Sequence, residues 1–214
     1  MKIMIKEVCI ENFTDVSRFI KLGADRFELN SDLAAGGLTP SFGMIKKTVE
    51  VAHQSHISVE TMIRPRGGNF VYSDNEIAIM KDDIQMAALL NSDGVVFGCL
   101  TSDNKLDKDK MKQLIDLARS LNLEIVMHMA FDEIAPEQWE ETIDWLAKHG
   151  IKRILTHGGP LSQSMFNTIP NLRKVIDLAR NKIEILPGGG INSDNLFQVD
   201  KLLHCDQYHG SKII

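Results

Sequence analysis

The segment Ile63-Arg64-Pro65-Arg66-Gly67-Gly68-Asn69-Phe70-Val71-Tyr72-Ser73-Asp74 joins an apolar run, residues 57–63, to a run with helical spacing. Pro65 cannot donate to the interior of a sheet ladder, so we expect the strand to end there. Ser73 and Glu76 have the spacing of a capping box, which begins a helix. The segment therefore predicts a strand-to-helix junction, with two arginines and two glycines in the connecting loop.

The two arginines of this loop are candidates for recognising an anion. Two guanidinium groups as close as Arg64 and Arg66 suit a carboxylate, a phosphate or a buried acid of the protein itself. Gly67 and Gly68 let the backbone turn or approach a ligand closely. The alternative is that both arginines form salt bridges within the loop.

Beyond the junction, strand-like and helix-like runs alternate through the chain. The expected strands lie at residues 3–9, 25–29, 57–63, 94–97, 123–129, 151–156, 183–186 and 205–209. Helical runs separate them, and one of these is expected to begin at Pro170. Strict alternation indicates a parallel sheet with right-handed crossovers. Even spacing favours a closed (β/α)₈ TIM-type barrel over an open doubly wound sheet.

The last part of the sequence has too few residues for the eighth helix of this fold. The chain stops at Ile214, where an eighth helix should follow the eighth strand. We therefore expect one α/β domain, residues 1–214, that lacks a full eighth helix. The side of the barrel without a helix would be under-covered, and a partner subunit could cover it. The sequence thus predicts a homo-oligomer, a dimer or larger.

Composition excludes several classes of protein. The 214 residues are 43% hydrophobic and 25% charged, with a formal net charge of -5, so no basic footprint suggests nucleic acid. No run approaches the roughly 18 apolar residues of a membrane span, and the first residues lack a signal-peptide pattern. We expect a cytoplasmic protein. Its three cysteines are far apart, which favours reduced thiols over a disulfide framework.

Polar residues at the carboxyl ends of the expected strands are candidates for catalysis, because active sites of this fold lie there. Glu28 interrupts an apolar strand, and it faces the barrel interior if Phe27 and Leu29 face the helices. Buried acids need partners, so a structural network explains Glu7 and Glu28 as well as catalysis does. His128 suits a general acid or base, or a core histidine bonded to a carboxylate. The candidate catalytic residues are Glu7, Glu28, Arg64, Arg66, His128 and Asp132.

Glycines follow two late strands and suggest an anion site. Backbone N–H groups in such loops can hold a phosphate, usually after strands seven and eight. The alternative is that both loops are tight turns. The candidate anion-binding residues are Thr156, His157, Gly158, Gly159, Gly188, Gly189, Gly190, His209 and Ser211.

Cys9 is the candidate metal ligand. Thiolate and thioether ligands select Cu(I), and Met62, Met127 and Met129 also lie near strand ends. However, no two of these soft residues have the local spacing of a ligand pair. Methionines are also common as gap-filling core residues.

The junction segment resembles the signature of the CutC family, the copper homeostasis proteins. Other segments fit the family in order: Gly23-Ala24-Asp25-Arg26-Phe27-Glu28-Leu29, Gly36-Gly37-Leu38-Thr39-Pro40-Ser41, His128-Met129-Ala130-Phe131-Asp132, Ile154-Leu155-Thr156-His157-Gly158-Gly159 and Gly188-Gly189-Gly190-Ile191. The resemblance departs in three places. Many members have an arginine where this chain has Met129, a second cysteine where it has Val8, and more residues at the C-terminus.

The resemblance implies a cytoplasmic, oligomeric TIM-type barrel associated with copper handling. The sequence and the resemblance therefore leave two functions open. One is a binding protein that holds Cu(I) at Cys9. The other is an enzyme that acts on a small phosphorylated or carboxylated substrate at the barrel mouth, with no organic cofactor. The residues favour the enzyme, and the family association favours copper.

Overall fold

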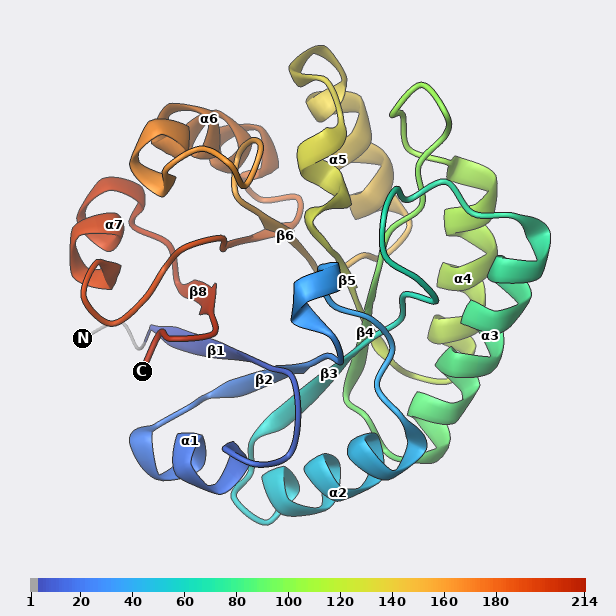
Figure 1. The fold of residues 1–214 in the computed structure, drawn as a ribbon. Helices are drawn as coiled ribbons and strands as arrows, with labels where there is room; N and C mark the ends of the chain where they lie inside the picture. The colour runs from blue at the N-terminus through green and yellow to red at the C-terminus, as the bar shows by residue number, and fades with distance from the viewer. Residues whose placement is uncertain (1–3) are drawn as a thin grey trace.

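The computed structural model describes residues 4–214 as a ring of parallel strands surrounded by helices (Figure 1). The strands are β1 (Ile5–Ile10), β2 (Arg26–Leu29), β3 (Ser58–Met62), β4 (Gly94–Phe97), β5 (Glu124–Met127), β6 (Arg153–Thr156), β7 (Glu184–Pro187) and β8 (Gln207–Gly210). The α-helices are α1 (Val16–Leu22), α2 (Phe42–His53), α3 (Asp74–Leu89), α4 (Lys108–Ser120), α5 (Trp139–Lys148), α6 (Met165–Ala179) and α7 (Leu196–Leu203). The 3₁₀ turns are η1 (Leu33–Ala35), η2 (Met129–Glu133) and η3 (Pro136–Gln138).

The sheet confirms the expected TIM-type barrel. Its strand order is β7-β6-β5-β4-β3-β2-β1-β8, and all strand pairings of the described sheet are parallel. The first strand pairs with the last. No ladder joins β7 to β8 within the described chain, which leaves a seam in a nearly closed barrel. The Gln207 side chain donates across this seam to the Glu184 carboxylate, 3.0 Å away.

The junction segment forms as its sequence predicts. Strand β3 ends at Met62, before Pro65. The capping box is present, because Ser73 accepts from the Glu76 N–H and the Glu76 carboxylate accepts from the Ser73 N–H. One helix start was wrong: α6 begins at Met165, capped by Ser164, and Pro170 lies inside it. A cap at Ser164 and a buried face from Met165 onward outweigh the preference of proline for a first turn.

The core has two layers. The larger apolar layer lies between the strands and the helices. A smaller cluster fills the barrel interior with one residue from each of five strands: Met62, Val96, Val126, Leu155 and Leu186. Two buried ion pairs, Glu7–Arg26 and Glu60–Arg153, also lie among the inward-facing side chains. The interior is therefore packed, and the open space lies at its ends.

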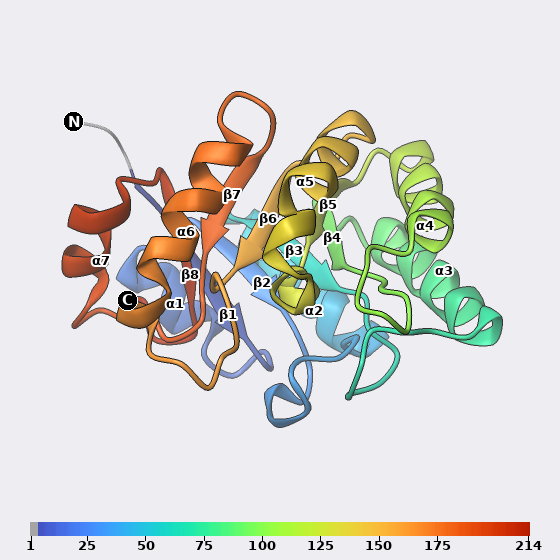
Figure 2. The same cartoon turned by 90° about the horizontal axis from the view of Figure 1, so that it is seen from above.

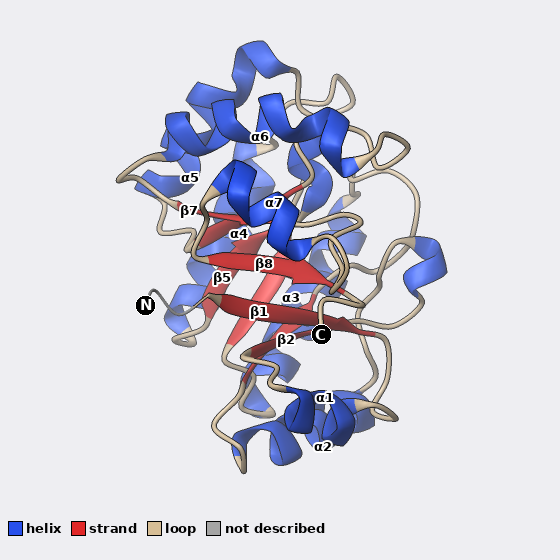
Figure 3. Cartoon of the chain, turned by 90° about the vertical axis from the view of Figure 1, so that its left-hand side faces the viewer, coloured by secondary structure: helices blue, strands red, loops and turns tan. Residues whose placement is uncertain are grey.

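No helix follows β8 in the described chain, as expected. Figure 3 shows β1 and β8 between α7 and α1 without a helix of their own. Their outer faces are nevertheless covered from within the chain, because Val8, Tyr208 and Ile213 are buried in one cluster with α1 and α7. The sequence predicted an under-covered side, and the structure shows that these side chains are already packed. Among the helices described, none has the length and apolar content needed to cross a membrane.

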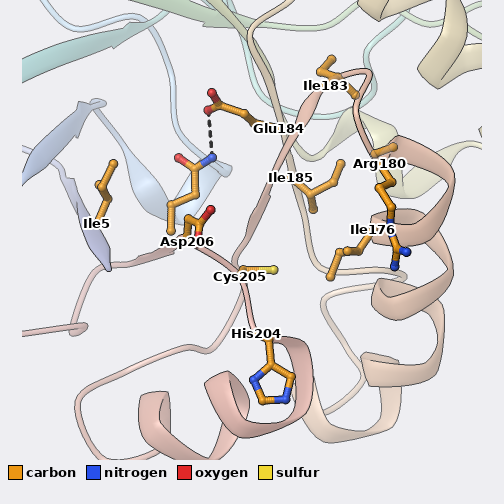
Figure 4. Close-up of a pocket in the computed structure, with 11 residues that line it drawn as sticks. Ile5, Ile176, Arg180, Ile183, Glu184, Ile185, His204, Cys205 and Asp206 are labelled. Carbon is orange, nitrogen blue, oxygen red and sulfur yellow. Dashed lines mark hydrogen bonds between the residues drawn. The ribbon is translucent and has the colours of Figure 1, made fainter. Parts of the chain in front are cut away.

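A hollow of about 330 Å³ lies at the amino-terminal end of the seam (Figure 4). Ile183 and Ile185 approach it from the β7 side, and Ile5 approaches it from β1. Active sites of this fold lie at the opposite, carboxyl-terminal face. The hollow therefore lies apart from the candidate site.

Candidate functional site

The candidate site is the barrel mouth at the carboxyl ends of the strands. Figure 2 shows the loops that follow these ends gathered on one side, with η1 projecting furthest. In Figure 1, η1 lies over the centre of the strands. Two adjoining hollows open beneath these loops, an inner one of about 210 Å³ and an outer one of about 430 Å³. Five residues line both hollows: Cys9, Leu33, Met129, Leu161 and His209.

Cys9, Glu28 and His209 form a potential three-ligand cluster, with one ligand atom from each residue within 4.8 Å of the others. They come from three adjacent strands: β1, β2 and β8. The Cys9 thiol lies 3.5 Å from the Glu28 carboxylate, and His209 Nε2 lies 3.8 Å from it. Asn30, a polar residue at the end of β2 that was not among the predicted site residues, donates to the same carboxylate oxygen at 2.8 Å. Only the strand order reveals this cluster, since no short spacing links its members.

Glu7 orients His209. The Nδ1–H group of His209 donates to the Glu7 carboxylate at 2.7 Å, which leaves Nε2 facing the cluster. Burial alone would raise the pKa of Glu7, but Arg26 and His209 hold this pKa at about 2. Burial likewise opposes a charge on His209, yet Glu28, Cys9 and Glu7 raise its pKa well above the ordinary value. Among the arginines Arg26, Arg64 and Arg66, only Arg26 forms an ion pair with Glu7 or Glu28 in the described chain.

The other two members of the cluster are protonated more easily than usual. Burial, followed by the Glu28 charge, raises the pKa of Cys9 to about 11. Burial also raises the pKa of Glu28. One of its carboxylate oxygens, Oε1, has no hydrogen-bond partner in the described chain. A cationic ligand would both share this carboxylate and favour loss of the thiol proton.

His128 lies in the inner hollow as a neutral ring. Its Nδ1 accepts the Ala130 N–H, so the proton of the neutral ring sits on Nε2. Burial, followed by the charge of Arg64, lowers the pKa of His128 to about 3. The buried Nε2–H donates to no group in the described chain. His128 therefore offers a hydrogen-bond donor and an uncharged ring, and it has no carboxylate partner.

Arg64 binds the backbone of the loop around η1 through its guanidinium group. Its guanidinium donates to the carbonyl oxygens of Ala35 (3.2 Å), Gly36 (2.9 Å), Gly37 (3.3 Å) and Gly68 (2.7 Å). The side chain is buried and lies 4.8 Å from the Phe70 ring centroid. These contacts give Arg64 a structural task, and its predicted role toward substrate stays a prediction.

Arg66 binds within its own loop, between β3 and α3. It pairs with Glu76 and donates to the carbonyl oxygens of Asn69 (2.9 Å) and Val71 (2.7 Å). Its side chain is 38% exposed and lines neither hollow of the mouth. The structure therefore places the two arginines in different surroundings, although only Pro65 separates them in the motif.

Asp132 occupies the glycine loop after β6. Its carboxylate accepts the N–H groups of His157 (2.9 Å), Gly158 (3.0 Å) and Gly159 (3.2 Å), and also the Thr156 hydroxyl. Burial raises the pKa of Asp132, and these donors oppose the rise. The predicted anion loop thus binds an anion supplied by the protein, and Asp132 does not line the mouth hollows.

The glycine loop after β7 faces the outer hollow. Gly189 and Gly190 line it together with Ser211, as the anion-site prediction requires. Gly188 lies deeper, where its carbonyl oxygen is 3.2 Å from His157 Nδ1. Lys212 also lines the hollow and was missed, because it follows the last expected strand outside any motif.

The fold and mouth together define a TIM-barrel protein with a polar site at the carboxyl ends of its strands. The chain belongs to the CutC family, whose model matches residues 4–214. It is 46% identical to a CutC family protein of Enterococcus faecalis, over 99% of this chain and 100% of that protein. It is 38% identical to the human copper homeostasis protein cutC homolog, over 97% of this chain and 72% of that protein.

Solved structures agree with this assignment. A crystal structure described as a putative copper homeostasis protein CutC, from Streptococcus agalactiae, superposes with a TM-score of 0.95 at 40% identity, covering 99% of this chain and 100% of that one. A deoxyribose phosphate aldolase from Aeropyrum pernix superposes with a TM-score of 0.71 at 11% identity, covering 98% and 86%. The second likeness concerns the barrel fold alone.

Proposed function

We propose that the protein takes part in copper homeostasis by binding Cu(I) at Cys9 and His209 in the cytoplasm. The Cys9–Glu28–His209 cluster, whose ligand atoms lie within 4.8 Å of one another, carries this proposal. The names of the human and streptococcal relatives support the copper role.

The residues of the cluster fit Cu(I). The thiolate of Cys9 and the neutral ring of His209, formed when metal binding releases their protons, are suitable ligands for it. The Met62 and Met129 side chains line the same inner hollow. A carboxylate that accepts the second ring N–H of a histidine is the usual support of a metal ligand, and Glu7 supplies it for His209. Glu28 is a harder ligand and is better suited to balancing charge beside the metal.

An anaerobic Cu(I) titration against a competing chelator tests the proposal. We expect one tightly bound ion in the wild type and at least a tenfold loss of affinity in Cys9→Ser. Cys205→Ser is the matched control, because that half-buried cysteine lies at the opposite end of the barrel. Wild-type affinity in Cys9→Ser would refute binding at this cluster.

We propose as a second function that the mouth is the active site of an enzyme for a small anionic substrate. The observation in its favour is that two buried polar atoms of the inner hollow, Glu28 Oε1 and His128 Nε2, have no partner in the described chain. Buried polar groups normally have partners, and ligand sites are the common exception. His128 would donate to a substrate oxygen, and Glu28 would move a proton.

Thermal stabilisation by a panel of phosphorylated and carboxylated metabolites tests this second function. We expect a subset to raise the melting temperature of the wild type, and His128→Phe to abolish the rise. His56→Phe, at an exposed position, should leave it unchanged. A panel without effect on the wild type would count against the enzyme.

A further inference from the structure

The outer hollow has the charge of an anion site. Lys212 lines it, and no acidic side chain of the described chain does. Lys212 is exposed and forms no ion pair with a described residue. This contrasts with the net charge of -5 of the whole chain, so the positive character is local.

Two glycines of the loop after β7 line the same space. Gly189 and Gly190 have φ angles of +82° and +87°, which glycine adopts readily. Their N–H groups donate to no group of the described chain. A Cβ atom added at Gly190 would meet nothing within 4 Å, so the backbone is open to the hollow there. Successive amides of this kind form an anion-binding concavity.

The loop after β6 already binds an anion through glycine amides. After β6, the N–H groups of Gly158 and Gly159 converge on the carboxylate of Asp132. The loop after β7 presents two glycine amides as well, but no side chain of the described chain reaches them. Any anion bound by this second loop would therefore come from outside the described chain.

We propose that the outer hollow binds the phosphate group of a small phosphate monoester, through the Gly189 and Gly190 amides and the Lys212 ammonium group. This inference rests on the second function proposed above and names the substrate class. A phosphate dianion offers several acceptor oxygens, which suits two amides, an ammonium group and the Ser211 hydroxyl better than a carboxylate does.

The connection between the hollows fixes the orientation of the ester. Cys9, Met129 and His209 line both hollows, so a ligand held at Gly190 can extend past them into the inner hollow. Its carbon end would reach His128 and Glu28 there. A Cu(I) ion on Cys9 and His209 would lie on the same path, so metal and ester would compete.

An NMR titration of the copper-free protein with inorganic phosphate tests the subsite. We expect saturable shifts of the Gly189 and Gly190 amide signals, with the Gly158 and Gly159 signals unchanged because Asp132 occupies those donors. Lys212→Glu should weaken binding at least tenfold. Lys46→Glu is the charge-matched control, since Lys46 is exposed on α2 and lines neither hollow.

The outcomes separate the subsite from the function on which it rests. No saturable shift at Gly189 and Gly190, or equal binding by Lys212→Glu and wild type, would overturn the subsite. Saturable shifts that persist in His128→Phe, without stabilisation by any ester in the metabolite panel, would keep the subsite and reject the enzyme. A subsite that serves the enzyme should bind a phosphate ester more tightly than inorganic phosphate.

Discussion

His128 is a buried histidine that the fold keeps uncharged. Its pKa falls from an ordinary value of 6.5 to about 3 on folding, so the unfolded chain binds a proton more readily. Stability is therefore lost as the pH falls below about 6.5. Between pH 7 and pH 5 we expect this residue to cost about 2 kcal/mol of the free energy of unfolding.

Urea unfolding at both pH values measures this cost. His128→Asn should lose about 2 kcal/mol less than the wild type between pH 7 and pH 5. His56→Asn should follow the wild type, because His56 is exposed and its left-handed backbone suits asparagine. Parallel pH profiles for wild type and His128→Asn would show that His128 is not kept neutral.

The sequence predicted the positions of the site residues better than their partners. Alternation along β2 placed Glu28 inside the barrel, where the structure has it. The sequence could not show that Arg64 binds backbone carbonyl oxygens, because every residue carries one. The insertion of Asp132 into the loop after β6 was equally hidden, since it depends on the path of η2.

At the scale of elements, Arg64 connects the loop of η1 to the loop after β3. Arg64→Ala would leave several carbonyl oxygens without a donor, so we expect a loss of about 2–3 kcal/mol in the free energy of unfolding. Arg64→Lys should recover little, because an ammonium group cannot reproduce the planar fork. Hydrogen exchange should accelerate at residues 33–37.

Arg18→Ala is the control for this loop. Arg18 has a side chain that is 63% exposed and a single ion pair, with Asp15 at 3.4 Å. Its removal should change stability by less than about 1 kcal/mol. Equal effects of Arg18→Ala and Arg64→Ala would mean that the buried guanidinium does not hold the loop.

The order of elements was the most predictable property. Hydrophobic periodicity located all eight strands and seven helices, because each strand must bury its faces between the interior and the helices. Element ends were less predictable, as α6 shows. Strand length gives no signal of the open seam, because β7 and β8 have four residues each, as do β4, β5 and β6.

At the scale of the whole molecule, we expect an oligomer through α7 and α1, the helices on either side of β8 and β1. Phe197 on α7 is 69% exposed and Leu22 on α1 is 50% exposed. Large exposed apolar residues on neighbouring elements are typical of an interface. Phe197→Asp should shift the molecular mass from light scattering toward that of a monomer.

Leu89→Asp is the control for the oligomer. Leu89 is 75% exposed at the end of α3, away from these helices. Its substitution should leave the mass unchanged. A wild-type protein that is already a monomer in the same measurement would contradict the prediction.

The pairing of the first strand with the last also bears on folding kinetics. His209 and Glu7 are 202 residues apart in sequence and 2.7 Å apart in the structure. Contacts of such separation carry the largest loop-closure entropy, so they form late. The Cys9 thiol should therefore stay reactive toward a thiol reagent until β8 docks on β1, and its protection during refolding would time the closing of the ring.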